Sequence, residues 1–139
     1  MDHAQLQRRI IDDADKYHFI AEEQWKAASE LEPTDDESFF EFLRLVRAGL
    51  RFYIRAYLVL DMIETDDEQD LEELLEIVCE ENPELAELVA KNDVVGVLNE
   101  EAVSDYSRSF SVAESMRAFL LQHSNQLAAT LHRRFLEED

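Results

Sequence analysis

Four arginines in the second quarter of the chain are spaced three, four and four residues apart, so a helix would line them up as one stripe. The stretch from Phe42 to Leu60 contains all four and has no acid, which gives it a net charge of +4. A cationic row on one helix face can bind an anion or a nucleotide, and the sequence predicts such a ligand site. Its residues, here called the arginine stripe, are Arg44, Arg47, Arg51 and Arg55.

The same arginine stripe also has a structural interpretation. The segment from Asp61 to Asp105 holds seventeen acids and one base, Lys91, which gives it a net charge of −16. A buried arginine must be paired with an acceptor. We therefore also expect ion pairs from the stripe to the acidic segment or to the acids of the first helix. The two interpretations differ in whether the guanidinium groups have carboxylate partners.

Other motifs that support chemistry are missing from the sequence. Asp15 and His18 would share a helix face, but a metal site in a helical bundle needs such pairs from several helices, and the chain has no second one. A Gly-rich phosphate loop, a paired-cysteine zinc motif and a serine nucleophile elbow are also absent. We expect no metal and no cofactor. The single cysteine, Cys79, has no cationic cluster beside it in sequence and is expected to be a small core residue.

The elements that position these residues are predicted to be helices, because apolar residues recur with helical spacing and only two Gly and two Pro occur. Capping boxes are expected at Thr34 with Glu37, Thr65 with Glu68 and Ser111 with Glu114, and a further helix start at Asn82-Pro83. The predicted helices span residues 5–30, 35–62, 67–80, 83–90, 94–105 and 112–136. They indicate an all-α single domain over residues 1–139, an antiparallel up-and-down four-helix bundle with extra short helices between helices 3 and 4.

Composition excludes several classes of function. The chain of 139 residues carries a formal net charge of −20, which would repel a phosphate backbone, so we expect no DNA binding. No apolar run is long enough to span a membrane, and the first twenty residues contain four acids, unlike a signal peptide. One cysteine fits a cytoplasmic location. The low Lys content leaves open whether the acidity serves a function or reflects a salt-adapted proteome.

Residues 39–88 contain a run of motifs that match a known family. The motifs are Phe39-Phe40-x-Phe42-Leu43, Arg51-x4-Ala56-Tyr57-Leu58, the turn Ile63-Glu64-Thr65, Asp70-Leu71-x-x-Leu74-Leu75, and Asn82-Pro83-Glu84-Leu85. This segment resembles the HEPN family of small helical bundles. The resemblance implies a four-helix bundle that is commonly a homodimer. Many members are toxin ribonucleases paired with a nucleotidyltransferase-like partner protein, and others are binding modules without known catalysis.

The family's catalytic signature is an arginine followed four to six residues later by a histidine, and Arg117-x5-His123 has this spacing. The resemblance implies that His123 would act as general acid or base and that Arg117 would hold the scissile phosphate, without a metal. On one helix the two side chains would point about 120° apart, so a symmetric dimer would be needed to bring copies together. The chain departs from the family at Gln69, where a histidine is usual.

The sequence favours a non-catalytic binding or interaction module that acts as a homodimer and binds a partner protein or a small anion. A first alternative is a toxin-like ribonuclease that uses Arg117 and His123 on RNA. A second is an acidic decoy that mimics nucleic acid and captures a basic protein, suggested by the −16 segment. None of these functions involves a membrane.

Overall fold

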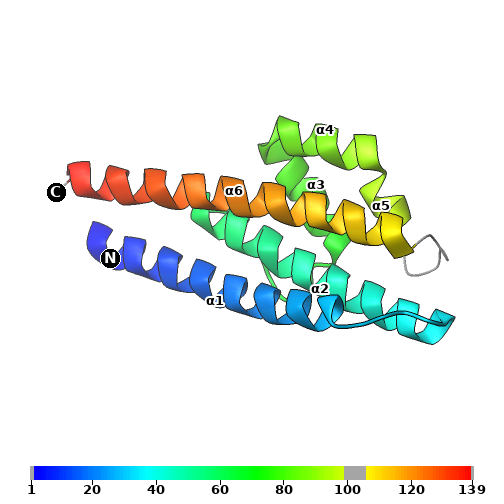
Figure 1. Cartoon of the computed structure of the whole chain (residues 1–139). Helices are drawn as coiled ribbons and strands as arrows, with labels where there is room; N and C mark the ends of the chain where they lie inside the picture. The colour runs from blue at the N-terminus through cyan, green and yellow to red at the C-terminus, as the bar shows by residue number, and fades with distance from the viewer. Residues whose placement is uncertain (1, 99–105, 139) are drawn as a thin grey trace.

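In a computed structural model, residues 2–98 and 106–138 form six helices, and these two ranges contain no strand. Figure 1 shows the long helices lying side by side and the short ones packed at one side of them. The prediction of an all-α bundle is confirmed. The helices are α1 (His3–Ser29), α2 (Asp36–Leu60), α3 (Leu71–Glu81), α4 (Pro83–Asn92), α5 (Val94–Val97) and α6 (Tyr106–Glu138).

The long helices α1 and α6 run antiparallel to each other. Gln7 contacts His132 at 3.3 Å near one end, and Glu22 contacts Arg117 at 3.0 Å further along, so residue numbers rise along α1 while they fall along α6. Helix α2 packs on both of them, whereas α4 contacts α6 from the side away from α1 (Figure 1). The third helix along the chain, α3, has only 11 residues, so the long helices form most of the frame.

Helix α2 is the centre of the core because its apolar residues recur on nearly every face. It packs against α1, α3 and α6, and no other helix in the described part of the chain contacts three of the others so extensively. Its fully buried side chains are Phe42, Leu43, Val46, Leu50, Tyr53, Ile54, Ala56 and Leu58. A second, smaller apolar cluster joins the far ends of the three long helices through Ile10, Ala14, Leu60 and Leu131.

Two capping boxes predicted in the middle of the chain are wrong. Helix α2 is capped by Asp35, whose carboxylate accepts from the Ser38 amide at 2.8 Å, rather than by Thr34 with Glu37. Helix α3 is capped by Asp70 and begins four residues later than predicted. Its predicted cap, the Thr65 hydroxyl, instead accepts a hydrogen bond from Arg55.

The predicted start of the last helix is also wrong, because α6 begins at Tyr106 and Ser111 and Glu114 lie inside it. Tyr106 and Phe110 pack on Phe42, with ring centroids 4.9 and 6.1 Å away, and these contacts favour the additional helical turn. The Asn82-Pro83 start is confirmed, because the Asn82 side chain accepts from the Leu85 amide. Of the helix predicted over residues 94–105, the structure has only α5, and residues 99–105 lie outside the described ranges.

Within the described residues, no helix combines the length and the apolar character that crossing a bilayer requires.

Candidate functional site

Two members of the arginine stripe fasten α2 to the elements that follow it. Arg47 Nη2 donates to both oxygens of the Glu72 carboxylate, at 2.7 and 2.8 Å, and Nη1 donates to the Leu98 carbonyl at 3.0 Å. Arg51 donates to the carbonyl oxygens of Gln69 at 2.7 Å and Asp67 at 2.9 Å. Arg47 therefore ties α2 to α3 and to the end of α5, and Arg51 holds the segment that connects α2 to α3.

Arg55 is the most deeply buried member of the stripe, with 3% of its surface exposed. It donates to the Thr65 hydroxyl at 2.8 Å, to Asp67 at 2.5 Å and to the Tyr17 hydroxyl at 3.1 Å. Its guanidinium lies 4.5 Å from the centre of the Tyr17 ring, in cation–π contact. The hydrogen bond from Arg55 lowers the pKa of Asp67 below its usual value. The buried Arg55 guanidinium therefore finds its hydrogen-bond acceptors within the chain.

The other three members of the arginine stripe, Arg44, Arg47 and Arg51, line an open surface depression of about 410 Å³. Arg44 lies at this depression and also binds Glu41 one turn away on α2. The depression is lined by Arg44, Arg47, Ala48, Arg51, Asp67, Glu68, Asp70 and Leu71. Three carboxylates thus face the same space as three guanidinium groups, and their charge opposes the entry of an anion.

A second polar cluster joins the three long helices through Glu22, Tyr53 and Arg117. The fully buried Tyr53 donates to Glu22 Oε1 at 2.6 Å and accepts from Arg117 Nε at 2.8 Å. Arg117 also contacts both Glu22 oxygens, at 3.0 and 3.1 Å, and its guanidinium lies 5.2 Å from the centre of the Trp25 ring. Burial, and then the hydrogen bond to Glu22, raise the pKa of Tyr53, so its phenol stays protonated.

His18 lies next to this cluster, with its ring 6.3 Å from that of Tyr53. Its Nε2 atom is buried and has no hydrogen-bond partner among the described residues. Burial lowers the pKa of His18, although the nearby carboxylates of Asp15 and Glu22 act in the opposite direction. His18 is therefore neutral at neutral pH. In residues 2–98 and 106–138, no three His, Cys, Asp or Glu side chains are grouped so that they could hold a metal.

His123, the second predicted catalytic residue, faces another part of the molecule. Its ring stacks on Phe119 with centroids 4.1 Å apart, and its Nε2 lies 3.9 Å from Glu84 of α4. Arg117 instead contacts α1 and α2. Within one chain, the structure does not bring Arg117 and His123 together at one point.

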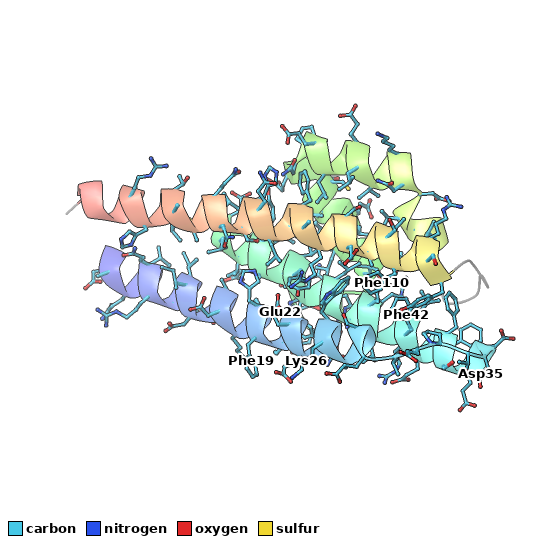
Figure 2. All side chains as sticks on the ribbon, in the orientation of Figure 1. Phe19, Glu22, Lys26, Asp35, Phe42 and Phe110 are labelled. Carbon is cyan, nitrogen blue, oxygen red and sulfur yellow. The ribbon has the colours of Figure 1, made fainter. Side chains whose placement is uncertain are left out.

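Sequence reasoning missed Glu22 and Tyr53 as partners of Arg117. The motif spacing indicates only neighbours along one helix, and these partners lie 95 and 64 residues away along the chain. Figure 2 shows Glu22 on α1 on the side that faces α6. Cys79, which was expected in the core, is half-buried, and burial raises the pKa of its thiol, so it is not an activated nucleophile.

Comparisons of the chain with models of protein families, with curated proteins and with solved structures find no match. The resemblance of residues 39–88 to the HEPN family therefore depends on the motifs alone.

Proposed function

We propose that the chain is a non-catalytic binding module that recognises a basic partner protein through the carboxylates of its α3–α4 region. The observation that carries this proposal is the exposure of the acids. Residues 61–98 contain fourteen acids and one base, and thirteen of the fourteen acids are exposed. Glu72, the exception, is half-buried beside Arg47. A surface whose charges are mostly of one sign attracts a partner of opposite charge and accelerates the association of the two proteins.

The contacts of the arginines support a protein partner over a small anion. Arg47, Arg51 and Arg55 all donate to acceptors within the chain. An incoming phosphate would have to replace these contacts and would meet the carboxylates of the same depression. A basic protein that binds the exposed acids of α3 and α4 would leave these arginine contacts in place.

The position of Arg117 supports a role without catalysis. A ribonuclease of the HEPN kind would need Arg117 and His123 at one scissile phosphate. Here Arg117 is engaged by Glu22 and Tyr53, and His123 stacks on Phe119 beside α4. The motif resemblance is compatible with this proposal, since the family includes binding modules.

Affinity capture with the purified protein tests the proposed surface. One variant neutralises exposed α3 carboxylates, with Glu73→Gln, Glu76→Gln and Glu80→Gln, and leaves Glu72 in its contact with Arg47. A matched variant neutralises three exposed acids elsewhere, with Glu23→Gln, Glu30→Gln and Glu32→Gln. We expect the wild type and the matched variant to retain the same basic protein at low salt, and the α3 variant to lose it. Equal retention by all three would overturn the proposal.

An RNA cleavage assay separates this proposal from the ribonuclease alternative. We expect the wild-type protein to leave single-stranded and structured RNA intact. Cleavage by wild-type protein that disappears in His123→Ala, with the helical circular dichroism unchanged, would refute a non-catalytic role.

We also propose that the module forms a homodimer through the outer face of α1. Phe19 is 67% exposed there, and Figure 2 shows it directed away from the bundle, as is Lys26 two turns later. Exposed aromatic side chains are frequent at protein interfaces. Sedimentation equilibrium of wild-type protein and Phe19→Glu tests this, with a dimer expected only for the wild type. A monomeric wild type would contradict the proposed homodimer. It would not affect the proposal that the acidic surface binds a basic protein.

A further inference from the structure

We infer that the groove between α4 and α6 seats a basic amphipathic helix of the partner, with an apolar side chain of that helix as its anchor. This inference rests on the proposed function and specifies which part of the acidic surface is recognised. The groove has a volume of about 340 Å³ and is lined by Glu84, Glu87, Leu88 and Lys91 of α4 and by Phe119 of α6.

Part of the apolar surface of α4 stays exposed, although Leu88 and Val89 also pack against the core. Leu85 is its only fully buried residue, while Leu88 and Val89 are half-buried. The four α4 residues that line the groove are spaced by three, one and three positions, which places them on one face of the helix. This face carries one apolar side chain between charged ones, the pattern that an interface uses for its anchor and rim.

The floor of the groove is held in place by His123. The Phe119 and His123 rings are stacked at 22° to each other, and the His123 Nε2 atom lies 3.9 Å from a Glu84 oxygen. Phe119 is itself half-buried. An aromatic ring fixed in this way loses little further conformational freedom when a partner covers it. The sequence interpretation gave His123 a catalytic role, and the geometry gives it a positioning role beneath an interface.

The charged residues at the groove indicate which kind of partner helix could bind there. The groove is lined by two exposed acids, Glu84 and Glu87, and one base, Lys91, and the exposed acids Glu80 and Glu81 lie shortly before α4 in the chain. A helix with lysine or arginine on either side of its apolar face would pair with these carboxylates while its anchor contacts Leu88 and Phe119. Helix-in-groove recognition uses this combination of apolar anchor and charged rim. Nucleic acid would be repelled by these carboxylates.

A defined peptide probe tests the inference directly. The probe is a synthetic amphipathic helix of about 18 residues, made of leucine and lysine with leucine at helical spacing. A scrambled peptide of the same composition has the same charge but no apolar face. We expect amide shifts in the isotope-labelled full-length protein to concentrate on residues 84–91 and 117–123. We also expect the scrambled peptide to bind at least about tenfold more weakly, because it lacks the anchor.

Variants with matched controls locate the contact. Leu88→Gln removes the apolar contact, and Val95→Gln makes the same kind of change at an exposed residue of α5. Glu87→Lys reverses a charge in the groove, and Glu23→Lys reverses one on α1. We expect the two groove variants to weaken binding about tenfold and the two controls to change it less than about twofold. Circular dichroism checks that every variant is folded.

The outcomes separate this inference from the proposed function. If the scrambled peptide binds as well as the amphipathic one, or Leu88→Gln binds like wild type, the groove is not the seat of the partner. If neutralising the α3 carboxylates still prevents capture in that case, the proposed recognition of a basic protein by the acidic surface is supported, and only the groove inference fails. Shifts centred on the apolar pocket around Met62, between α1 and α2, would also overturn the groove.

Discussion

Tyr53 of α2 and Arg117 of α6 meet in a hydrogen bond of 2.8 Å, from the guanidinium Nε to the phenol oxygen, although 64 residues separate them in the chain. The same phenol donates to Glu22 of α1, so three helices are joined at one buried oxygen. Arg117, which the motif spacing predicts as a catalytic residue, thus also links the long helices through its contacts.

We predict that Tyr53→Phe lowers the free energy of unfolding by about 1–2 kcal/mol, because it removes one hydrogen bond to each of two charged groups. Urea unfolding followed by circular dichroism measures the change. In a double-mutant cycle with Glu22→Gln, we expect the two losses to be non-additive by about 0.5 kcal/mol or more. Additive losses would show that the Glu22–Tyr53 contact contributes nothing to stability.

Arg55 and Arg44 should differ in their contribution to stability, although both belong to the arginine stripe. Arg55→Met removes hydrogen bonds to Thr65, Asp67 and Tyr17, and we expect a loss of about 1–3 kcal/mol. The exposed Asp67 can be solvated after the change, which limits the cost. Arg44→Met should change the free energy of unfolding by less than about 0.5 kcal/mol, because the Arg44 side chain is 64% exposed.

Thermal unfolding of these two variants measures the difference. If both arginines prove equally dispensable, Arg55 does not fasten the α2–α3 connection, and a ligand-binding role for Arg55 becomes the better interpretation to test.

His18 should make the folded state sensitive to mild acid. Burial lowers its folded-state pKa below the ordinary value of 6.5, so the unfolded chain takes up the proton first as pH falls. The stability from neutral His18 is therefore complete above pH 6.5 and is lost as the pH falls through the lower, folded-state pKa. The groups that face it are Asp15 and Glu22 of α1 and Tyr53 of α2.

The measurement compares the Tm of wild type and His18→Gln between about pH 7.5 and about pH 5. We expect the advantage of the wild type to shrink toward low pH. His132→Gln, at an exposed position on α6, serves as the control for the loss of a histidine side chain. A constant difference between wild type and His18→Gln would contradict a buried neutral imidazole.

Gly49 offers a stabilising substitution at the α1–α2 contact. A Cβ atom at this position would lie 3.5 Å from the Ala21 carbonyl oxygen and 3.6 Å from Gln24 Cβ, both ordinary contact distances. Because Gly lowers helix stability relative to Ala, we predict that Gly49→Ala raises the free energy of unfolding by about 0.5–1 kcal/mol. A loss of stability in urea unfolding would mean that the two helices cannot accommodate the methyl group.

The local features of this fold could be predicted from the sequence. Apolar spacing indicates the helices and the central position of α2, because helical periodicity depends on residues three and four positions apart. The Asn82-Pro83 start is local for the same reason, since its cap and its amide partner lie three residues apart. The spacing of the arginine stripe likewise follows from a single helix.

Only the tertiary structure decided what these residues contact. The Thr65 hydroxyl, which the sequence predicts as a helix cap, accepts a hydrogen bond from Arg55. The guanidinium of Arg117, which the motif predicts as catalytic, contacts Tyr53 and Glu22. Each outcome depends on the rotation and register of packed helices, which are set by contacts between residues far apart in the chain. Sequence periodicity defines which face of a helix a side chain occupies, and packing between helices determines which partner that face meets.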